Sequence, residues 1–194
     1  MRVFVTGAAG LVGGEVCARL VAAGYRVTAL VHRNPDLRGN DGSPVRVAGV
    51  VRGDVSVPQF GWDAAQFAKV AGGHDLLVHC AATVRFDLPE EDYRAVNQGG
   101  TAHALALARA GGMRFLHVST AYVCGARDGP IREDDPLPAV GFANGYEASK
   151  AAGERLVRAS GLAWAIARPS IVAGAHADGA IRQFDTTYAA FKLI

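Results

Sequence analysis

Short apolar runs alternate with segments of mixed polarity along this chain. Each apolar run has the length of a strand, and the mixed segments repeat their apolar positions near the helical period of about 3.6 residues. The runs predicted as strands are residues 2–6, 26–31, 45–51, 76–80, 115–119 and 163–167. The segments predicted as helices are residues 10–23, 62–70 and 93–110, and a further helix that carries Tyr146 and Lys150. Continuous apolar strands that alternate with helices predict an α/β fold, a doubly wound parallel sheet with right-handed crossovers.

Length and composition agree with one such domain. The chain has 194 residues, half of them hydrophobic, and its 24 glycines suit a buried sheet with many tight turns. Two polar loops, residues 34–44 and 125–145, separate predicted elements, and no repeat or low-complexity linker divides the chain. Because ligands of these sheets bind at the carboxyl ends of the strands, candidate functional residues are sought there.

Charge and cysteine content exclude several classes of protein. A net charge of +2 predicts no nucleic-acid partner. No apolar run approaches the roughly 20 residues that cross a bilayer, and the first strand begins at Arg2 with no signal peptide before it. Cys17, Cys80 and Cys124 lack CxxC spacing, and the histidines lack metal-ligand spacing. We therefore expect a cytoplasmic protein with no membrane partner and no metal.

Three glycines follow the first strand at every third position. Gly7, Gly10 and Gly13 lie between that strand and the first predicted helix. A dinucleotide diphosphate must approach backbone N–H groups at a helix N-terminus without meeting a Cβ atom. The spacing therefore favours a dinucleotide site at the start of the first βαβ unit, and a generic tight turn is the alternative.

Charged residues after the second and third strands bear on the choice of dinucleotide. An NAD site typically has a carboxylate at the end of the second strand, but this chain has Arg33 there. A guanidinium suits a 2′-phosphate, so the sequence favours NADP, with NAD as the alternative because Asp36 is near. Asp54, after the third strand, is a candidate acceptor for the adenine amine or, alternatively, a turn residue.

Tyr146 and Lys150 are spaced to share one helix face. An ammonium beside a phenol favours the phenolate, so we expect Lys150 to lower the pKa of Tyr146 and to donate to ribose hydroxyls. Thr120, at the end of the fifth strand, is positioned to donate a hydrogen bond to a substrate carbonyl oxygen. Strand alternation predicts that the adjacent Ser119 faces the other side of the sheet.

These motifs together resemble the extended short-chain dehydrogenases/reductases, which include the NAD-dependent epimerases and dehydratases. The motifs are TGxxGxxG at 6–13, HxAA at 79–82, NxxGT at 97–101, Ser119-Thr120, YxxxK at 146–150 and Arg-Pro-Ser at 168–170. The resemblance implies an NAD(P)-binding Rossmann fold. It also implies that Thr120, Tyr146 and Lys150 are catalytic, that Asn97 supports them, and that the proline segment backs the nicotinamide. The implied cofactor positions are Gly7, Ala9, Gly10, Leu11, Val12, Arg33, Asp54, Val55, Ala81, Ala82, Thr83, Tyr146, Lys150, Pro169 and Ile171.

A narrower resemblance involves residues 82–87, 118–123 and 168–172. These segments are similar to the thioester-reductase branch, which includes the male-sterility-type fatty acyl-CoA reductases. This likeness implies NADPH-dependent hydride transfer to an acyl thioester or another carbonyl, with Tyr146 as general acid and an aldehyde or alcohol as product. The alternatives are a nucleotide-sugar epimerase or dehydratase that uses bound NAD, and a non-catalytic dinucleotide-binding module.

Extended members of this superfamily continue past the sixth strand into a smaller lobe that closes over the substrate. We therefore expect residues 1–175 to form the core of a single NAD(P)-binding domain. Residues 176–194 are expected to begin a substrate lobe that is largely missing. The expected partners are a small-molecule substrate and a second copy of the chain, because the helices near Tyr93 and Tyr146 form dimers in many relatives.

Overall fold

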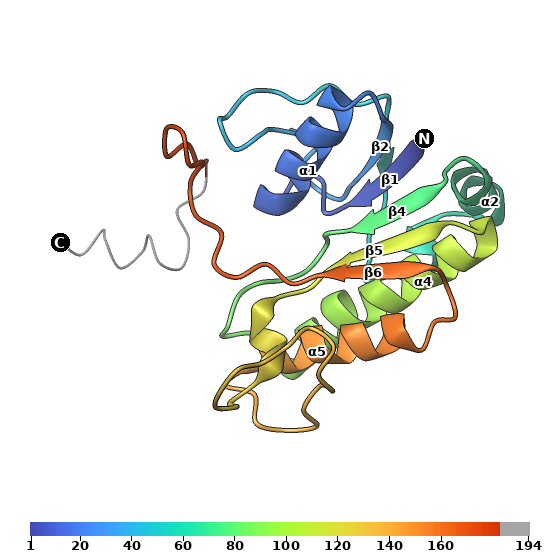
Figure 1. The fold of residues 1–194 in the computed structure, drawn as a ribbon. Coiled ribbons are helices and arrows are strands. Elements are labelled where there is room, and N and C mark those ends of the chain that lie inside the picture. The colour runs from blue at the N-terminus through green and yellow to red at the C-terminus, as the bar shows by residue number, and fades with distance from the viewer. Residues whose placement is uncertain (183–194) are drawn as a thin grey trace.

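The computed structural model describes residues 1–182. Six parallel strands form one sheet in the order β3-β2-β1-β4-β5-β6. The strands are β1 (Arg2–Thr6), β2 (Arg26–Val31), β3 (Gly49–Arg52), β4 (Leu76–His79), β5 (Arg114–Val118) and β6 (Trp164–Ala167). The strand order reverses between β1 and β4, which places a crevice at their carboxyl ends. The predicted Rossmann fold is therefore confirmed (Figure 1).

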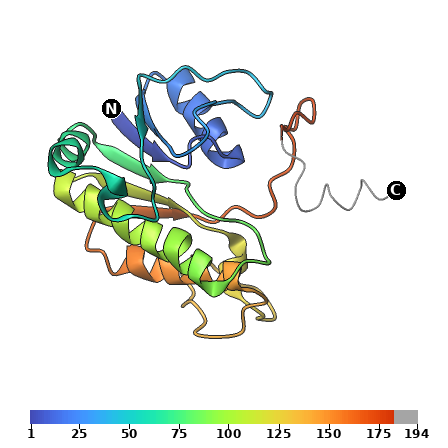
Figure 2. The same cartoon turned by 180° about the vertical axis from the view of Figure 1, so that it is seen from behind.

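Helices cover both faces of the sheet. One face is covered by α1, and α2, α4 and α5 lie on the other (Figures 1 and 2). The longer helices are α1 (Leu11–Ala22), α2 (Ala64–Gly72), α4 (Gly100–Gly111) and α5 (Gly145–Arg158). Shorter turns are η1 (Pro58–Gly61), α3 (Glu90–Tyr93), η2 (Arg94–Gly99) and η3 (Ala121–Cys124).

Strand alternation divides the core into two clusters. Val3 and Val5 on β1 are fully buried and belong to the cluster that contains Cys17 of α1. Phe4, between them, is fully buried on the opposite face with Leu107 of α4. Since each such side chain contributes about 1.5–3 kcal/mol when buried, β1 is fixed from both sides. The glycine turn that follows β1 therefore starts from a rigid element.

The third strand is shorter than the sequence pattern predicts. Residues 45–51 were expected as a strand, but β3 spans Gly49–Arg52. The Val45 N–H donates to the carbonyl of Leu37, and the side chains of Val45 and Val47 pack against the cluster under α1. The apolar pattern at Val45 and Val47 therefore reflects packing against the cluster under α1, not membership of the sheet.

The predicted helix at residues 93–110 is three consecutive pieces. A short α3 leads into the π-helical turn η2, and α4 follows without a break. Asn97 lies in the π turn and is buried. Such turns widen a helix by one residue and often occur at functional sites.

No helix in residues 1–182 is both long and apolar enough to span a bilayer. The expected beginning of a second lobe at residues 176–194 falls mostly outside the described part of the chain, because residues 183–194 are not described.

Candidate functional site

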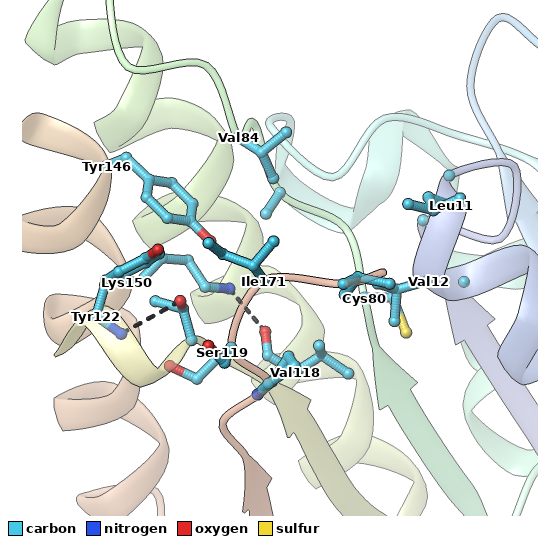
Figure 3. Close-up of a pocket in the computed structure, with 18 of the residues that line it drawn as sticks. Leu11, Val12, Cys80, Val84, Val118, Ser119, Tyr122, Tyr146, Lys150 and Ile171 are labelled. Atoms are coloured by element: carbon cyan, nitrogen blue, oxygen red, sulfur yellow. Dashed lines mark hydrogen bonds between the residues drawn. The ribbon is translucent and has the colours of Figure 1, made fainter. Parts of the chain in front are cut away.

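A cavity of about 340 Å³ opens at the carboxyl ends of the strands. Its walls come from the glycine turn after β1, the segments after β4, β5 and β6, and the first turns of α5 (Figure 3). Nine of the positions expected to bind cofactor line it, together with Thr120: Gly7, Gly10, Leu11, Val12, Ala82, Tyr146, Lys150, Pro169 and Ile171. The motifs that are far apart in the sequence therefore meet in one place.

The glycine turn is closed so tightly that larger residues do not fit. Gly7 has φ +66°, and a Cβ atom there would lie 2.5 Å from the backbone nitrogen of Ala81. A Cβ atom on Gly13 would lie 2.1 Å from the carbonyl oxygen of Gly7. The Gly10 N–H closes the turn by donating to that same oxygen at 3.0 Å. This packing brings the N-terminus of α1 to the cavity.

The N-terminus of α1 has the features of an anion site. Its N-cap is Gly10, which provides no side-chain cap, and its first turn has no acidic residue. The first N–H groups of an α-helix have no partner within the helix. Leu11, Val12 and Gly13 line the cavity. A dinucleotide diphosphate would satisfy these donors, so the residues present fit the implied cofactor.

Asp54 is a turn residue in this structure. Its Oδ1 accepts hydrogen bonds from the N–H and hydroxyl of Ser56 at 2.9 and 2.7 Å, and its Oδ2 lies 3.4 Å from Nε2 of His32. Burial raises the pKa of Asp54, but the hydrogen bonds from Ser56 and the nearby His32 and Arg33 outweigh it and hold the pKa below its usual value. Arg33 is exposed at the end of β2. The adenine and 2′-phosphate roles of these residues stay predictions.

Lys150 is buried beneath the cavity. Its Nζ donates a hydrogen bond of 2.7 Å to the carbonyl oxygen of Val118, the last residue of β5. Burial lowers its pKa to about 8. The N-cap of α5, Asn144, accepts a hydrogen bond from the Glu147 N–H at 3.0 Å, so the helix that carries the lysine begins at a defined residue.

Tyr146 differs electrostatically from the expectation. Burial raises its pKa, and a hydrogen bond from the Thr120 hydroxyl lowers it by less. The expected lowering of the pKa by Lys150 is not found, since Lys150 is not among the groups that shift the pKa of Tyr146 and its Nζ donates to the Val118 carbonyl. The phenol is therefore held in its protonated form near neutral pH.

Ser119 also lines the cavity, beside Thr120. Its Oγ is buried and has no hydrogen-bond partner among residues 1–182, and its N–H still pairs with the Ala167 carbonyl at 2.7 Å. Thr120 is the one that contacts Tyr146, and its Oγ1 also accepts a hydrogen bond from the Tyr122 N–H at 3.3 Å.

Asn97 joins two segments behind the cavity rather than lining it. Its side chain accepts from the Thr83 N–H at 2.8 Å and donates to the Thr83 carbonyl at 3.1 Å. It also donates to the Ser149 hydroxyl at 2.8 Å. Ser149 lies between Tyr146 and Lys150 on α5, so Asn97 fixes that helix relative to the segment after β4.

The other expected cofactor residues do not line the cavity: Ala9, Arg33, Asp54, Val55, Ala81 and Thr83. Sequence reasoning missed several apolar residues on the outer wall. Val84 and Phe86 are 57% and 50% exposed, and the Phe86 ring lies edge-on to that of Tyr146 with centroids 5.6 Å apart. The sequence clue to Val84 and Phe86 was that these two apolar residues occur in a segment with neither strand nor helix periodicity.

Two histidines stack behind the site. The rings of His79 and His117 lie 5.6 Å apart, and both are buried. Nδ1 of His79 is 2.8 Å from the Thr6 hydroxyl, whereas neither ring nitrogen of His117 has a hydrogen-bond partner among residues 1–182. Burial, together with the charge of Lys150, lowers the pKa of His79 to about 3 and that of His117 well below its usual value.

Comparisons with known proteins agree with this geometry. The family described as Male sterility protein, an NAD-binding family, matches residues 45–194. The terminal R domain of the myxalamid PKS-NRPS pathway superposes with a TM-score of 0.85 at 30% identity, over 95% of this chain and 52% of that one. A 4-hydroxy-2-methyl-3-oxo-4-farnesyl-3,4-dihydroquinoline-1-oxide ketoreductase of Stigmatella aurantiaca is 34% identical, over 90% of this chain and 51% of its own length. L-2-aminoadipate reductase of Saccharomyces cerevisiae is 27% identical, over 92% of this chain and 16% of its own length.

The chain thus spans about half the length, or less, of the relatives it matches. The shared half is the one that contains the glycine turn and the Thr120, Tyr146 and Lys150 cluster.

Proposed function

Because the chain belongs to the male sterility protein family, a reductase branch of the extended short-chain dehydrogenases/reductases, we propose that it reduces a carbonyl or acyl thioester with NADPH. One observation carries this proposal. The glycine turn at the N-terminus of α1 and the cluster of Thr120, Tyr146 and Lys150 line the same cavity.

Bound NADPH would supply the hydride. Tyr146, which is protonated near neutral pH, would donate its phenolic proton to the substrate oxygen. Thr120 would hydrogen-bond the same oxygen as negative charge develops there. A ketone or aldehyde thereby gains a C–H and an O–H bond to give an alcohol. With a thioester, hydride addition forms the C–H bond, the hydroxyl proton of the adduct returns to Tyr146, and the C–S bond breaks so that the thiolate leaves with its electron pair and an aldehyde remains.

Lys150 would act as a positioning and charge-carrying group. Among residues 1–182, its Nζ has one hydrogen bond, to the Val118 carbonyl, and an ammonium has three donors. The remaining donors would serve a ribose hydroxyl and the Tyr146 phenolate left after proton transfer. A lysine whose pKa is about 8 returns a proton readily near neutral pH.

The outer wall supports an apolar substrate over a nucleotide sugar. Val84, Phe86 and Ile171 line the cavity and are partly exposed, each at 48% or more. Exposed apolar side chains that gather around a reactive group mark a ligand surface. They offer an acyl or other hydrocarbon group favourable burial, but they offer no hydrogen bonds to sugar hydroxyls.

The proposal is tested by measuring NADPH oxidation with a panel of acyl thioesters, ketones, aldehydes and nucleotide sugars. Tyr146→Phe is expected to lower turnover by about 10²–10⁴-fold while cofactor affinity changes less than about 2-fold. Tyr25→Phe is the matched control, because Tyr25 is exposed and does not line the cavity. No turnover by the unmodified protein with any substrate, or full turnover by Tyr146→Phe, would contradict the proposal.

A further inference from the structure

A compact turn at residues 175–180, near the end of the described chain, brings Arg182 to the glycine turn. The Ala175 N–H donates to the Ala180 carbonyl at 3.0 Å, and the Gly179 N–H donates to the Ala175 carbonyl at 2.7 Å. Ile181, the next residue, is buried. This turn lies beside the loop that follows β2 in both views of the fold (Figures 1 and 2). It therefore holds Arg182 in a defined place against α1.

Arg182 reaches the N-terminus of α1. Its Nη2 donates a 3.0 Å hydrogen bond to the carbonyl oxygen of Ala9, the residue before the N-cap of the helix. The same nitrogen lies 3.3 Å from the point that a Cβ atom of Gly14 would occupy. Gly14 thus has a packing role that the three-residue glycine spacing does not explain. It leaves room first for the carbonyl oxygen of Arg38, which would lie 2.2 Å from such a Cβ atom, and then for the guanidinium.

Among residues 1–182, this guanidinium has no counterion. Arg182 is partly buried, and its bond to Ala9 is its one polar contact in the described structure. Its Nε is buried with no hydrogen-bond partner, and no carboxylate oxygen of residues 1–182 lies within 4 Å of the guanidinium. A partly exposed cation without a counterion, beside the positive end of a helix, is suited to bind an anion.

From these contacts we infer that Arg182 binds a phosphate group of the dinucleotide, either the diphosphate or the 2′-phosphate. The guanidinium donors that remain at Nη1 and Nη2 would meet phosphate oxygens in the planar geometry that arginine favours. The positive end of the α1 dipole attracts the same charge. The inference rests on the proposed dinucleotide site and adds to it a residue 173 positions away from the glycine turn.

The test is a binding titration rather than turnover. NADPH and NADH are titrated separately into the unmodified chain and into Arg182→Gln, Arg182→Lys and Arg109→Gln. Arg109 is the matched control, since it also donates one hydrogen bond to a backbone carbonyl, that of Ser160 at 2.9 Å, but lies in the last turn of α4 rather than at the N-terminus of α1. Thermal unfolding of each variant establishes that it is folded.

We expect Arg182→Gln to raise the Kd of NADPH about 10-fold or more, Arg182→Lys to raise it less, and Arg109→Gln to change it less than about 2-fold. Equal losses for NADPH and NADH identify the diphosphate as the group bound, and a loss confined to NADPH identifies the 2′-phosphate. Unchanged affinity of folded Arg182→Gln for both dinucleotides overturns the inference and leaves the proposed function intact. An unmodified chain that binds neither dinucleotide overturns both.

Discussion

Alanine substitutions at two glycines with positive φ would distinguish the cost of backbone strain from the cost of a steric clash in the glycine turn. Gly7 has φ +66° and Gly24, which follows α1, has φ +80°. Alanine in this conformation costs about 1–2 kcal/mol at either position. A Cβ atom on Gly24 meets nothing within 4 Å, whereas one on Gly7 lies 2.5 Å from the backbone nitrogen of Ala81. Because that contact involves backbone on both sides, the structure must shift, which adds about 1–3 kcal/mol.

We therefore expect Gly7→Ala to lower the free energy of unfolding by about 2–5 kcal/mol and Gly24→Ala by about 1–2 kcal/mol. The two variants should differ more clearly in NADPH affinity. Gly7→Ala moves the turn that presents the N–H groups of α1 and should raise the Kd about 10-fold or more, while Gly24→Ala should leave it unchanged.

Urea denaturation and NADPH titration of the two variants measure these quantities side by side. Equal stability losses combined with equal, unchanged affinities would refute the reasoning. That result would mean that the contact between Gly7 and Ala81 does not hold the turn in its binding conformation.

The remaining predictions concern buried titratable side chains behind the site. Because the folded-state pKa values of His79 and His117 are lowered, the unfolded chain binds protons that the native chain does not, so stability should fall as pH drops below about 6.5, by up to about 1.4 kcal/mol per pH unit for each histidine. His117→Phe should remove its share of that slope in urea unfolding measured at pH 5 and 6.5, and an unchanged slope would count against it. Glu154→Gln should lower the free energy of unfolding by about 3–5 kcal/mol, because fully buried Glu154 accepts two hydrogen bonds from Arg168, at 2.9 and 2.8 Å. A loss below about 1 kcal/mol in urea denaturation would show that the pair is better solvated than its burial indicates.

Local patterns were sufficient to predict the sheet and the main site. The apolar run at Arg2–Thr6 forms β1 because both of its faces are buried, and periodicity reports that directly. The spacing of Tyr146 and Lys150 placed both side chains at the cavity because four residues make about one helical turn. The glycine turn could be predicted to lie at the same cavity, because it follows β1 and the carboxyl ends of parallel strands meet at one edge of the sheet.

Properties that depend on tertiary contacts were not accessible from local patterns. The direction of the Tyr146 pKa shift depends on burial and on the hydrogen bond from Thr120, and neither is encoded in the spacing of Tyr146 and Lys150. Phe86 lies in a segment without periodicity, so its packing on Tyr146 has no sequence signature. Arg182 meets Ala9 only because the chain folds back after β6.

The π turn at Arg94–Gly99 has a consequence for the evolution and engineering of this protein. It sets the rotational phase between α3 and α4, so that Asn97 reaches Ser149 while Thr101, one turn later, lies 3.3 Å from Nε2 of His79. A single-residue deletion there would restore an ordinary α-helical turn and remove the local widening, whereas a deletion within α4 would rotate everything before it by about 100° relative to everything after it. The two parts of this continuous helix therefore differ in how they tolerate a change in length.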